Sequence, residues 1–183
     1  AAGSKDAAIV RSLAAGAYSF QITGAGTGLT RAELYDADSL APFAANRLVR
    51  VSLRAKVGTG SGTVLGQFVI SGTAPKRVLL RGAGPALLKV DSKLAVLANP
   101  FLRLRRISGS VSTVIRENDD WAVGHDTTVL ARASAQAGAT PGFASGSKDA
   151  AILITLPPGS YSVELLGRYA GTGIGQLEIY EVK

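Results

Sequence analysis

The chain has 183 residues, 46% of them hydrophobic, so it is long enough and apolar enough to fold around a core and is not a disordered segment. Its 22 glycines favour short strands and tight turns, and the absence of cysteine excludes disulfides, a thiolate nucleophile and cysteine-bound metals. The net charge of +7 is compatible with anionic partners, but the basic residues are spread along the chain, so nucleic acid is not an expected partner.

The chain opens with a segment that recurs near its end. Residues 3–36 read GSKDAAIVRSLAAGAYSFQITGAGTGLTRAELYD, and residues 146–181 read GSKDAAILITLPPGSYSVELLGRYAGTGIGQLEIYE. Seven consecutive residues, Gly3–Ile9 and Gly146–Ile152, are identical. This self-similarity indicates a duplicated structural unit, and the first copy lacks the part that should precede it. Either the chain belongs to a longer tandem array, or the incomplete copy finds its missing strands elsewhere.

Each copy of the repeat shows the pattern of a half-buried strand. Apolar and polar residues alternate over Ala17–Thr23 in the first copy and over Ser160–Leu166 in the second. One strand precedes this pattern and one follows it, so we predict a three-stranded meander in each copy. Without partner strands, the first copy would expose an edge for assembly. The residues expected there are Ala7, Ile9, Tyr18, Phe20 and Ile22.

The region between the copies predicts more strands. Residues 38–46 read as a linker. Alternating or continuous apolar residues predict strands at 47–57, 63–71, 76–81, 101–107 and 112–116. One short helix is plausible over Leu87–Ala98, and residues 122–145 read as a long loop with a helical turn near 128–135.

These elements predict an all-β fold with at most one short helix. We expect two packed jelly-roll-like antiparallel β-sandwiches, or one extended sandwich. The first sandwich is placed in residues 1–85, where strands within 47–81 complete the partial repeat 1–38. The second occupies residues 95–183, and residues 86–94 connect the two. No apolar run is long enough to span a membrane, and a start at Ala1 without methionine fits a processed, exported chain.

The densest group of oxygen ligands follows a predicted strand and comprises Glu117, Asn118, Asp119 and Asp120. Calcium takes several hard oxygen ligands, so this group is the candidate metal site. An ordinary turn fits the same residues, because Asn and Asp favour turns and EF-hand spacing is absent. No other cofactor is expected.

No motif predicts an active site. The single histidine, His125, has acidic neighbours, but there is no Gly-x-Ser-x-Gly elbow to supply a nucleophile, so we read it as a surface residue. The glycine-rich runs fit neither dinucleotide nor P-loop patterns and read as hairpin turns. Arginines on alternating strands are candidate contacts for an anionic polysaccharide or cell wall, namely Arg50, Arg54, Arg103, Arg105 and Arg106.

Several phrases of the sequence resemble a known kind of module. They are RLVRVSLR at 47–54, TAPKRVLLRGAGP at 73–85, ENDDW at 117–121, SKDAA at 147–151 and LPPGSYSV at 156–163. This order is similar to tandem β-sandwich repeats of large secreted and surface bacterial proteins, and to bacterial pre-peptidase C-terminal domains. The resemblance implies export to the cell surface or medium, a β-sandwich, and a structural or accessory role without catalysis.

Two functions therefore stay open. The first is a structural module that assembles head-to-tail with copies of itself by strand complementation into a fibre or surface layer. The second is an accessory module that tethers a secreted protein to anionic glycan or cell wall. Neither is an enzyme.

Overall fold

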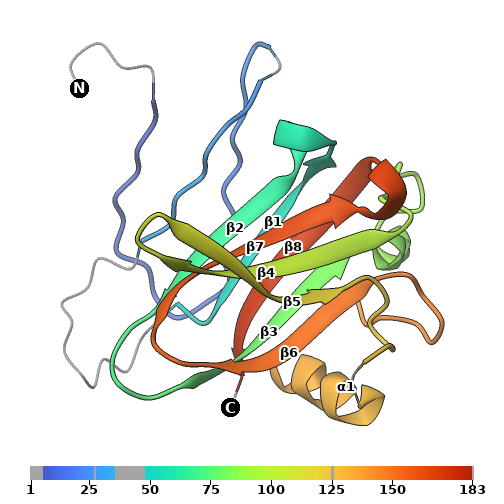
Figure 1. The fold of residues 1–183 in the computed structure, drawn as a ribbon. Helices are drawn as coiled ribbons and strands as arrows, with labels where there is room; N and C mark the ends of the chain where they lie inside the picture. Colours follow the sequence, from blue (N-terminus) through green and yellow to red (C-terminus); the bar gives the residue numbers. More distant parts are fainter. Residues whose placement is uncertain (1–5, 27, 36–47, 125, 183) are drawn as a thin grey trace. The chain divides into compact units, whose positions relative to one another are not determined.

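The computed structural model describes residues 6–26, 28–35, 48–124 and 126–182, and the chain divides into two compact units, Ala1–Leu48 and Val49–Lys183. In the first unit, the described residues contain neither helix nor strand. The described residues of the second unit form eight strands and one α-helix, which Figure 1 labels. Nowhere in the described part of the chain is a helix both long enough and apolar enough to cross a membrane.

The strands form two antiparallel four-stranded sheets, which confirms the predicted all-β sandwich. In order across the first sheet lie β1 (Arg50–Val57), β8 (Gly173–Val182), β3 (Lys76–Ala83) and β6 (Ala150–Leu156). In order across the second lie β2 (Val64–Ile70), β7 (Gly159–Gly167), β4 (Pro100–Ser108) and β5 (Val111–Asn118). The helix α1 covers Thr127–Gln136, and short 3-10 turns cover Gly60–Gly62, Pro85–Lys89 and Arg168–Ala170.

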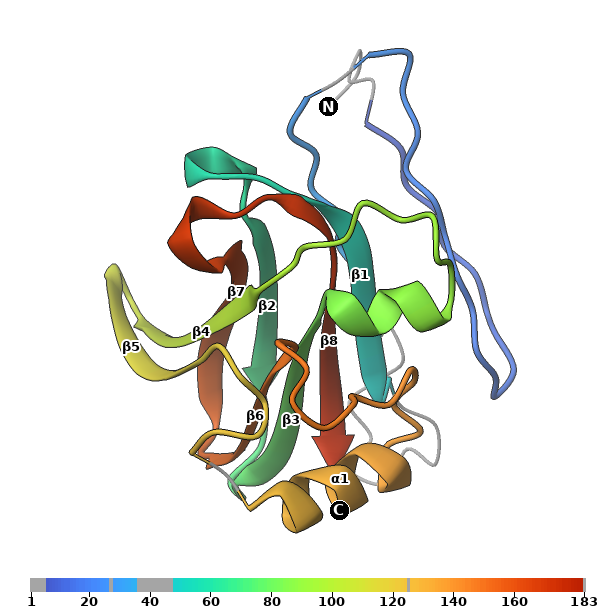
Figure 2. The ribbon, with the colours of Figure 1, turned by 90° about the vertical axis from the view of Figure 1, so that its right-hand side faces the viewer.

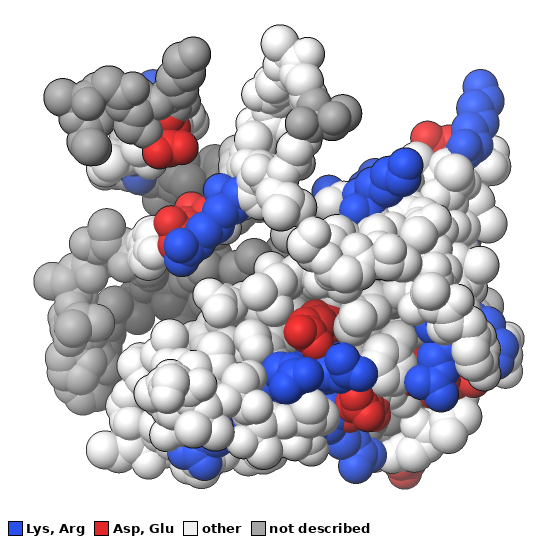
Figure 3. Space-filling view, turned by 45° about the horizontal axis from the view of Figure 1, so that its top comes forward, with Lys and Arg blue, Asp and Glu red and all other residues white. Residues whose placement is uncertain are grey.

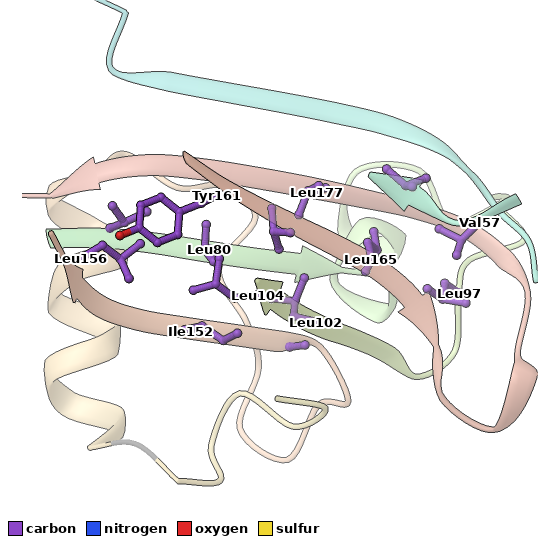
Figure 4. Packing of buried hydrophobic residues seen from close by; sticks show 14 of the residues in the cluster. Val57, Leu80, Leu97, Leu102, Leu104, Ile152, Leu156, Tyr161, Leu165 and Leu177 are labelled. Carbon is purple, nitrogen blue, oxygen red and sulfur yellow. The ribbon is translucent and has the colours of Figure 1, made fainter. Parts of the chain in front are cut away.

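The main core lies between the two sheets. Alternation directs every second residue of a strand inward, so β4 contributes Leu102 and Leu104 while β3 contributes Leu80. Figure 4 shows these side chains meeting those of β6, β7 and β8. Each fully buried leucine stabilises the sandwich by about 1.5–3 kcal/mol relative to an exposed one.

A second apolar layer covers the outer face of the sheet that contains β3. Leu79 on β3 and Tyr180 on β8 pack in one cluster with Trp121 and with Leu130 of α1. Asp126 caps this helix, since its carboxylate accepts hydrogen bonds from the first turn. Figure 2 shows α1 running across the ends of β3 and β8. The central strands of this sheet are therefore buried on both faces, whereas a two-layer sandwich has one face of each sheet exposed to solvent.

The predicted meander is wrong for the second repeat copy. The strands β6, β7 and β8 are consecutive in the chain, but none pairs with another: β6 and β8 both flank β3, whereas β7 lies in the opposite sheet. Each connection crosses from one sheet to the other. Alternation identifies the buried face of a strand but carries no information about which sheet it joins.

The pairing also differs from the expected division into sandwiches. Strands within 47–81 were expected to complete the first repeat copy at 1–38. Instead β1, β2 and β3 pair with β8, β7 and β6 of the second copy. One sandwich thus contains strands from both sides of the expected connector at 86–94, because the strands before it form hydrogen-bonded pairs with strands after it. Residues 38–46, the predicted linker, lie outside the described residues.

The helix forms later in the chain than the plausible one at Leu87–Ala98. A 3-10 turn begins at Pro85, and no α-helix follows it in that stretch. The segment Thr127–Gln136 has no internal Gly or Pro and carries an aspartate cap, so it satisfies the local requirements for an α-helix.

Candidate functional site

The second repeat copy is anchored to the sandwich by Asp149, which directly precedes β6. Its carboxylate is fully buried. One oxygen, Oδ1, accepts hydrogen bonds from the backbone N–H groups of Gly84 (2.8 Å) and Ala86 (3.1 Å). The other accepts from the hydroxyl of Ser147 (2.6 Å). These charge-assisted bonds tie the repeat to the loop that follows β3.

A buried ionic network fixes the third strand of the copy, β8. Arg81 on β3 and Glu178 on β8 are almost fully buried, and Nη1 lies 2.8 Å from Oε2. Tyr180 and Gln176 donate hydrogen bonds to the other carboxylate oxygen, at 2.7 and 3.1 Å. Burial, with the neighbouring charge of Glu178, raises the pKa of Tyr180 to about 12. Sequence analysis missed this network; its one visible signal was an arginine within the apolar run of β3.

Both repeat copies contain the same local hydrogen bond from a tyrosine hydroxyl to a backbone carbonyl. In β7 the hydroxyl of Tyr161 donates to the carbonyl of Pro157 at 2.7 Å, across the turn that precedes the strand. In the first copy the hydroxyl of Tyr18 donates to the carbonyl of Ala14 at 2.9 Å. Both bonds join residues four apart, at matching positions of the repeat. The turn therefore takes the same local form in both copies.

A second local contact recurs at the position of β8. Tyr35 donates to Glu33 at 2.9 Å, as Tyr180 donates to Glu178. Arg31 also contacts Glu33, at 2.6 Å. The hydrogen bond to Glu33 raises the pKa of Tyr35. The first copy thus has the side-chain pattern of β7 and β8 although its described residues form no strand.

The two copies differ in what covers their apolar residues. Three residues of β7 lie in the core and are at most 1% exposed: Tyr161, Val163 and Leu165. The corresponding residues of the first copy are all more than half exposed: Tyr18 (58%), Phe20 (57%) and Ile22 (51%). Ala7 and Ile9 are also exposed, whereas the matching Ala150 and Ile152 are fully buried. All five residues expected at the assembly edge therefore lie on an exposed segment.

Three of the four residues expected to bind calcium are carboxylates that face cations. No three His, Cys, Asp or Glu side chains gather around a possible metal position in the described part of the chain, and His125 lies outside it. The partner cations come from distant parts of the sequence. The pairs are Glu117 with Arg103 (2.7 Å), Asp119 with Arg168 (3.1 Å) and Asp120 with Lys148 (2.9 Å).

The fourth residue of the calcium candidate, Asn118, has a structural role. Its side-chain nitrogen donates to the carbonyls of Asp120 (3.0 Å) and Val123 (3.1 Å), and its oxygen accepts from the backbone N–H of Ala151 (2.9 Å). It therefore braces the turn after β5 against the start of β6. This arrangement fits the alternative of an ordinary Asn-Asp turn.

The arginines on β4 are largely neutralised. Arg103 and Arg105 lie 3.6 and 3.5 Å from the carboxylate of Glu164 on β7, and Arg103 also contacts Glu117. These carboxylates raise the pKa of Arg103. Arg106 is exposed on the same strand. On the face shown in Figure 3, lysines and arginines are scattered among acidic residues and do not merge into one patch.

The arginines on β1 have a different environment. Arg50, Ser52 and Arg54 line a pocket of about 320 Å³ together with Thr140 and Pro141. Arg54 donates to the side-chain oxygen of Gln176, and Arg50 lies over the ring of Tyr180. Among the described carboxylates, none forms an ion pair with Arg50 or Arg54. The structure thus separates the five candidate arginines into two groups on different sheets.

No family model and no curated protein sequence matches the chain. Among solved structures, it is similar to the pre-peptidase C-terminal domain of a collagenase from Bacillus anthracis. The two share 10% sequence identity, and the similarity covers 72% of this chain and 89% of that domain, with a TM-score of 0.41. At this identity and TM-score, the likeness transfers no residue's role to this chain.

Proposed function

We propose that the protein is a non-catalytic structural module that acts outside the cell and joins like modules head-to-tail. Residues 6–35 supply strands to a neighbouring module, and repetition of this contact builds a fibre or surface layer. A contact between two different surfaces does not close on itself, so it extends into a chain of modules.

One observation carries this proposal: the first repeat copy has the residues of three sandwich strands but exposes them. An apolar segment with unpaired backbone groups gains free energy from burial against another sheet. Main-chain hydrogen bonds then supply affinity, and the alternating side chains supply specificity. The recurring contacts of Tyr18 and Tyr35 support strand formation, because part of the local structure is already in place.

The pocket beside β1 favours a second candidate function, binding of an anionic polymer such as acidic glycan or cell wall. Arg50 and Arg54, which form no ion pair with the described carboxylates, line that pocket with Ser52, and Glu178 also lines it. Arginine binds carboxylate, phosphate and sulfate groups through its planar fork of donors. The pair Arg103 and Arg105 supports this function less, since acidic residues already occupy them.

Light scattering and negative-stain microscopy of the purified chain over a concentration series test assembly. We expect large or filamentous assemblies at high concentration. The double variant Ile9→Asp with Phe20→Asp should stay monomeric, because charge on the buried face of a strand opposes docking. The matched control places aspartate at the exposed residues Val111 and Val123 of the sandwich and should assemble like the wild type. A wild type that is monomeric at every concentration would contradict the proposal.

A further inference from the structure

We propose that the side of the sandwich bounded by the edge strands β1 and β2 accepts residues 17–23 and 31–35 of a second copy of this chain. Residues 31–35 add a strand beside β1, and residues 17–23 add a strand beside β2. This side of the sandwich is called the open side. The inference rests on the proposed function and specifies where the segment of one module docks on the next.

The open side exposes apolar residues from the core face of β1. The strands β1 and β2 are edge strands of the two sheets, and they contact each other. Ala55 and Val57 pack in the main core, and alternation places Val49, Val51 and Leu53 on the same face. Yet the last three are 52%, 37% and 37% exposed. The main core therefore ends on this side with apolar side chains that solvent still reaches.

The edges on the opposite side of the sandwich are less suited to accept a strand. The edge strand β6 buries Ala150 and Ile152 completely. The edge strand β5 places Arg116 opposite the core residue Leu104 and contains a bulge there. Inward-pointing charges and bulges protect an edge from further pairing. Exposed core-face residues and a regular strand are combined at β1.

The backbone of β1 also presents hydrogen-bonding groups to the open side. In an antiparallel pair, the N–H and C=O groups of alternate residues point to opposite neighbours. The carbonyl of Val49 accepts a hydrogen bond from the N–H of Glu181, at 3.1 Å, so Val49 points to β8. The backbone groups of Arg50, Ser52 and Arg54 therefore point away from β8, toward the position of an added strand.

Residues 31–35 suit this edge because they repeat the strand that pairs with the other edge of β1. The strand β8 pairs with β1 in antiparallel order and directs Leu177 into the core. In the repeat, Ala32 takes the position of Leu177, and Leu34 follows on the same face. Leu34 is 52% exposed, so docking buries it together with the accessible residues of β1.

Residues 17–23 suit β2 in the same way, because they repeat β7. The strand β7 pairs with β2 and directs Val163 into the core. Phe20 takes the position of Val163, and docking places it beside Phe68, a partly buried core residue of β2. The donor segment and the open side are different surfaces of one chain. Repetition of their contact therefore extends into an open row of modules.

Like charges exclude two registers of residues 31–35 along β1. Every strand pair of the described sandwich is antiparallel, and the added strand follows the same order. Registers that keep apolar residues on the core face differ by two residues. One of them sets Arg31 opposite Arg54, and the next sets it opposite Lys56. Like charges directly opposite each other destabilise a strand pair.

The remaining register along residues 48–56 pairs opposite charges. It sets Glu33 opposite Arg50 and Arg31 opposite Ser52. Arg50 forms no ion pair with the described carboxylates and lies at the open side, so Glu33 supplies the anion that it lacks. Glu33 keeps its contact with Arg31, because the two side chains lie on the same face of the added strand.

Disulfide trapping tests this register, since the chain has no cysteine of its own. In the proposed register Ala32 and Val51 form a non-hydrogen-bonded pair, with Cα atoms about 4.5 Å apart, which a disulfide can bridge. The single variants Ala32→Cys and Val51→Cys are mixed at high concentration with glutathione disulfide as the oxidant. We expect a linked dimer with one chain of each variant, identified by mass spectrometry.

The matched control mixes Leu34→Cys with Val51→Cys. These positions meet only in the register that sets Arg31 opposite Arg54, so their cross-linking should be at least about threefold slower. A rate equal to that of Ala32→Cys with Val51→Cys would overturn the register.

A charge exchange gives a second comparison in the mixture of Ala32→Cys and Val51→Cys. Arg50→Glu, placed in the Val51→Cys chain, should slow cross-linking by about fivefold, because it faces Glu33 of the other chain. Glu33→Arg, placed in the Ala32→Cys chain, should then restore the rate. Failure of this rescue would overturn the pairing of Glu33 with Arg50.

The inference is overturned if the mixed variants form no linked dimer, or if a chain with both cysteines closes the disulfide within itself in dilute solution. Assembly of the wild type without the linked dimer would contradict the open side as acceptor and leave the proposed function standing. A linked dimer together with a wild type that never assembles would contradict the proposed fibre alone. Absence of both would overturn both.

Discussion

Asp149 shows how one residue can define the place of a whole repeat. Its buried carboxylate accepts hydrogen bonds from two backbone N–H groups in the loop after β3. Its counterpart Asp6 occupies the same position of the repeat in an exposed segment. The same residue type is therefore buried in one copy and exposed in the other.

We predict that Asp149→Ala lowers the free energy of unfolding by about 3 kcal/mol, because buried N–H groups would lose a charged acceptor. Urea denaturation followed by tryptophan fluorescence measures the change, since Trp121 packs in the sandwich. The matched control is Asp6→Ala, which should shift the midpoint far less, because Asp6 is exposed. Equal effects of the two substitutions would contradict the assignment.

The network around Glu178 predicts how stability depends on pH. The pKa of Tyr180 is raised from about 10 in the unfolded chain to about 12 in the folded one. Folding thus favours the protonated phenol, and this contribution is complete below pH 10. As pH rises from about 10 to 12, the unfolded state loses its proton first, so the free energy of unfolding should fall by up to about 2–3 kcal/mol. Tyr180→Phe should remove this part of the decline, measured by urea unfolding at several pH values.

At the scale of elements, the arginines of β1 and β4 look alike in sequence but differ in their surroundings. Both strands alternate arginine with apolar residues. The strand β4 is central in its sheet, and its neighbours β5 and β7 supply carboxylates for Arg103 and Arg105. The strand β1 is at an edge, and the pocket beside it holds Arg50 and Arg54.

If the chain binds acidic polysaccharide, Arg50→Gln with Arg54→Gln should reduce affinity for heparin at low salt by at least about tenfold, since two charged contacts are lost. Arg103→Gln with Arg105→Gln is the matched pair and should change affinity little. Calorimetric titration at two salt concentrations measures both. A larger loss for the β4 pair would reverse this assignment.

The elements also show what sequence could and could not predict. Alternation and glycine turns located all eight strands of the sandwich, because local pattern suffices to define a strand and its buried face. Pairing depends on partners far along the chain, so the crossing of β6, β7 and β8 between sheets was not predictable. The ion pairs that Lys148 and Arg168 form with two carboxylates of the calcium candidate were not predictable for the same reason.

At the scale of the molecule, the two units differ in secondary structure although each contains one copy of the repeat. The sandwich has a filled core, with β6, β7 and β8 in place. The described residues 6–26 and 28–35 have the same pattern of residues without a sheet. The candidate assembly residues of the first copy lie on this exposed segment, and their role in assembly stays a prediction.

Hydrogen exchange of residues 6–35, measured by mass spectrometry at low and high protein concentration, tests the central claim most directly. Strand formation on assembly would pair the backbone amides, so we predict fast exchange in dilute solution and strong protection at high concentration. Residues 150–180 should be protected at both concentrations and serve as the internal reference. Fast exchange of residues 6–35 in material that scattering shows to be assembled would contradict strand complementation by this segment.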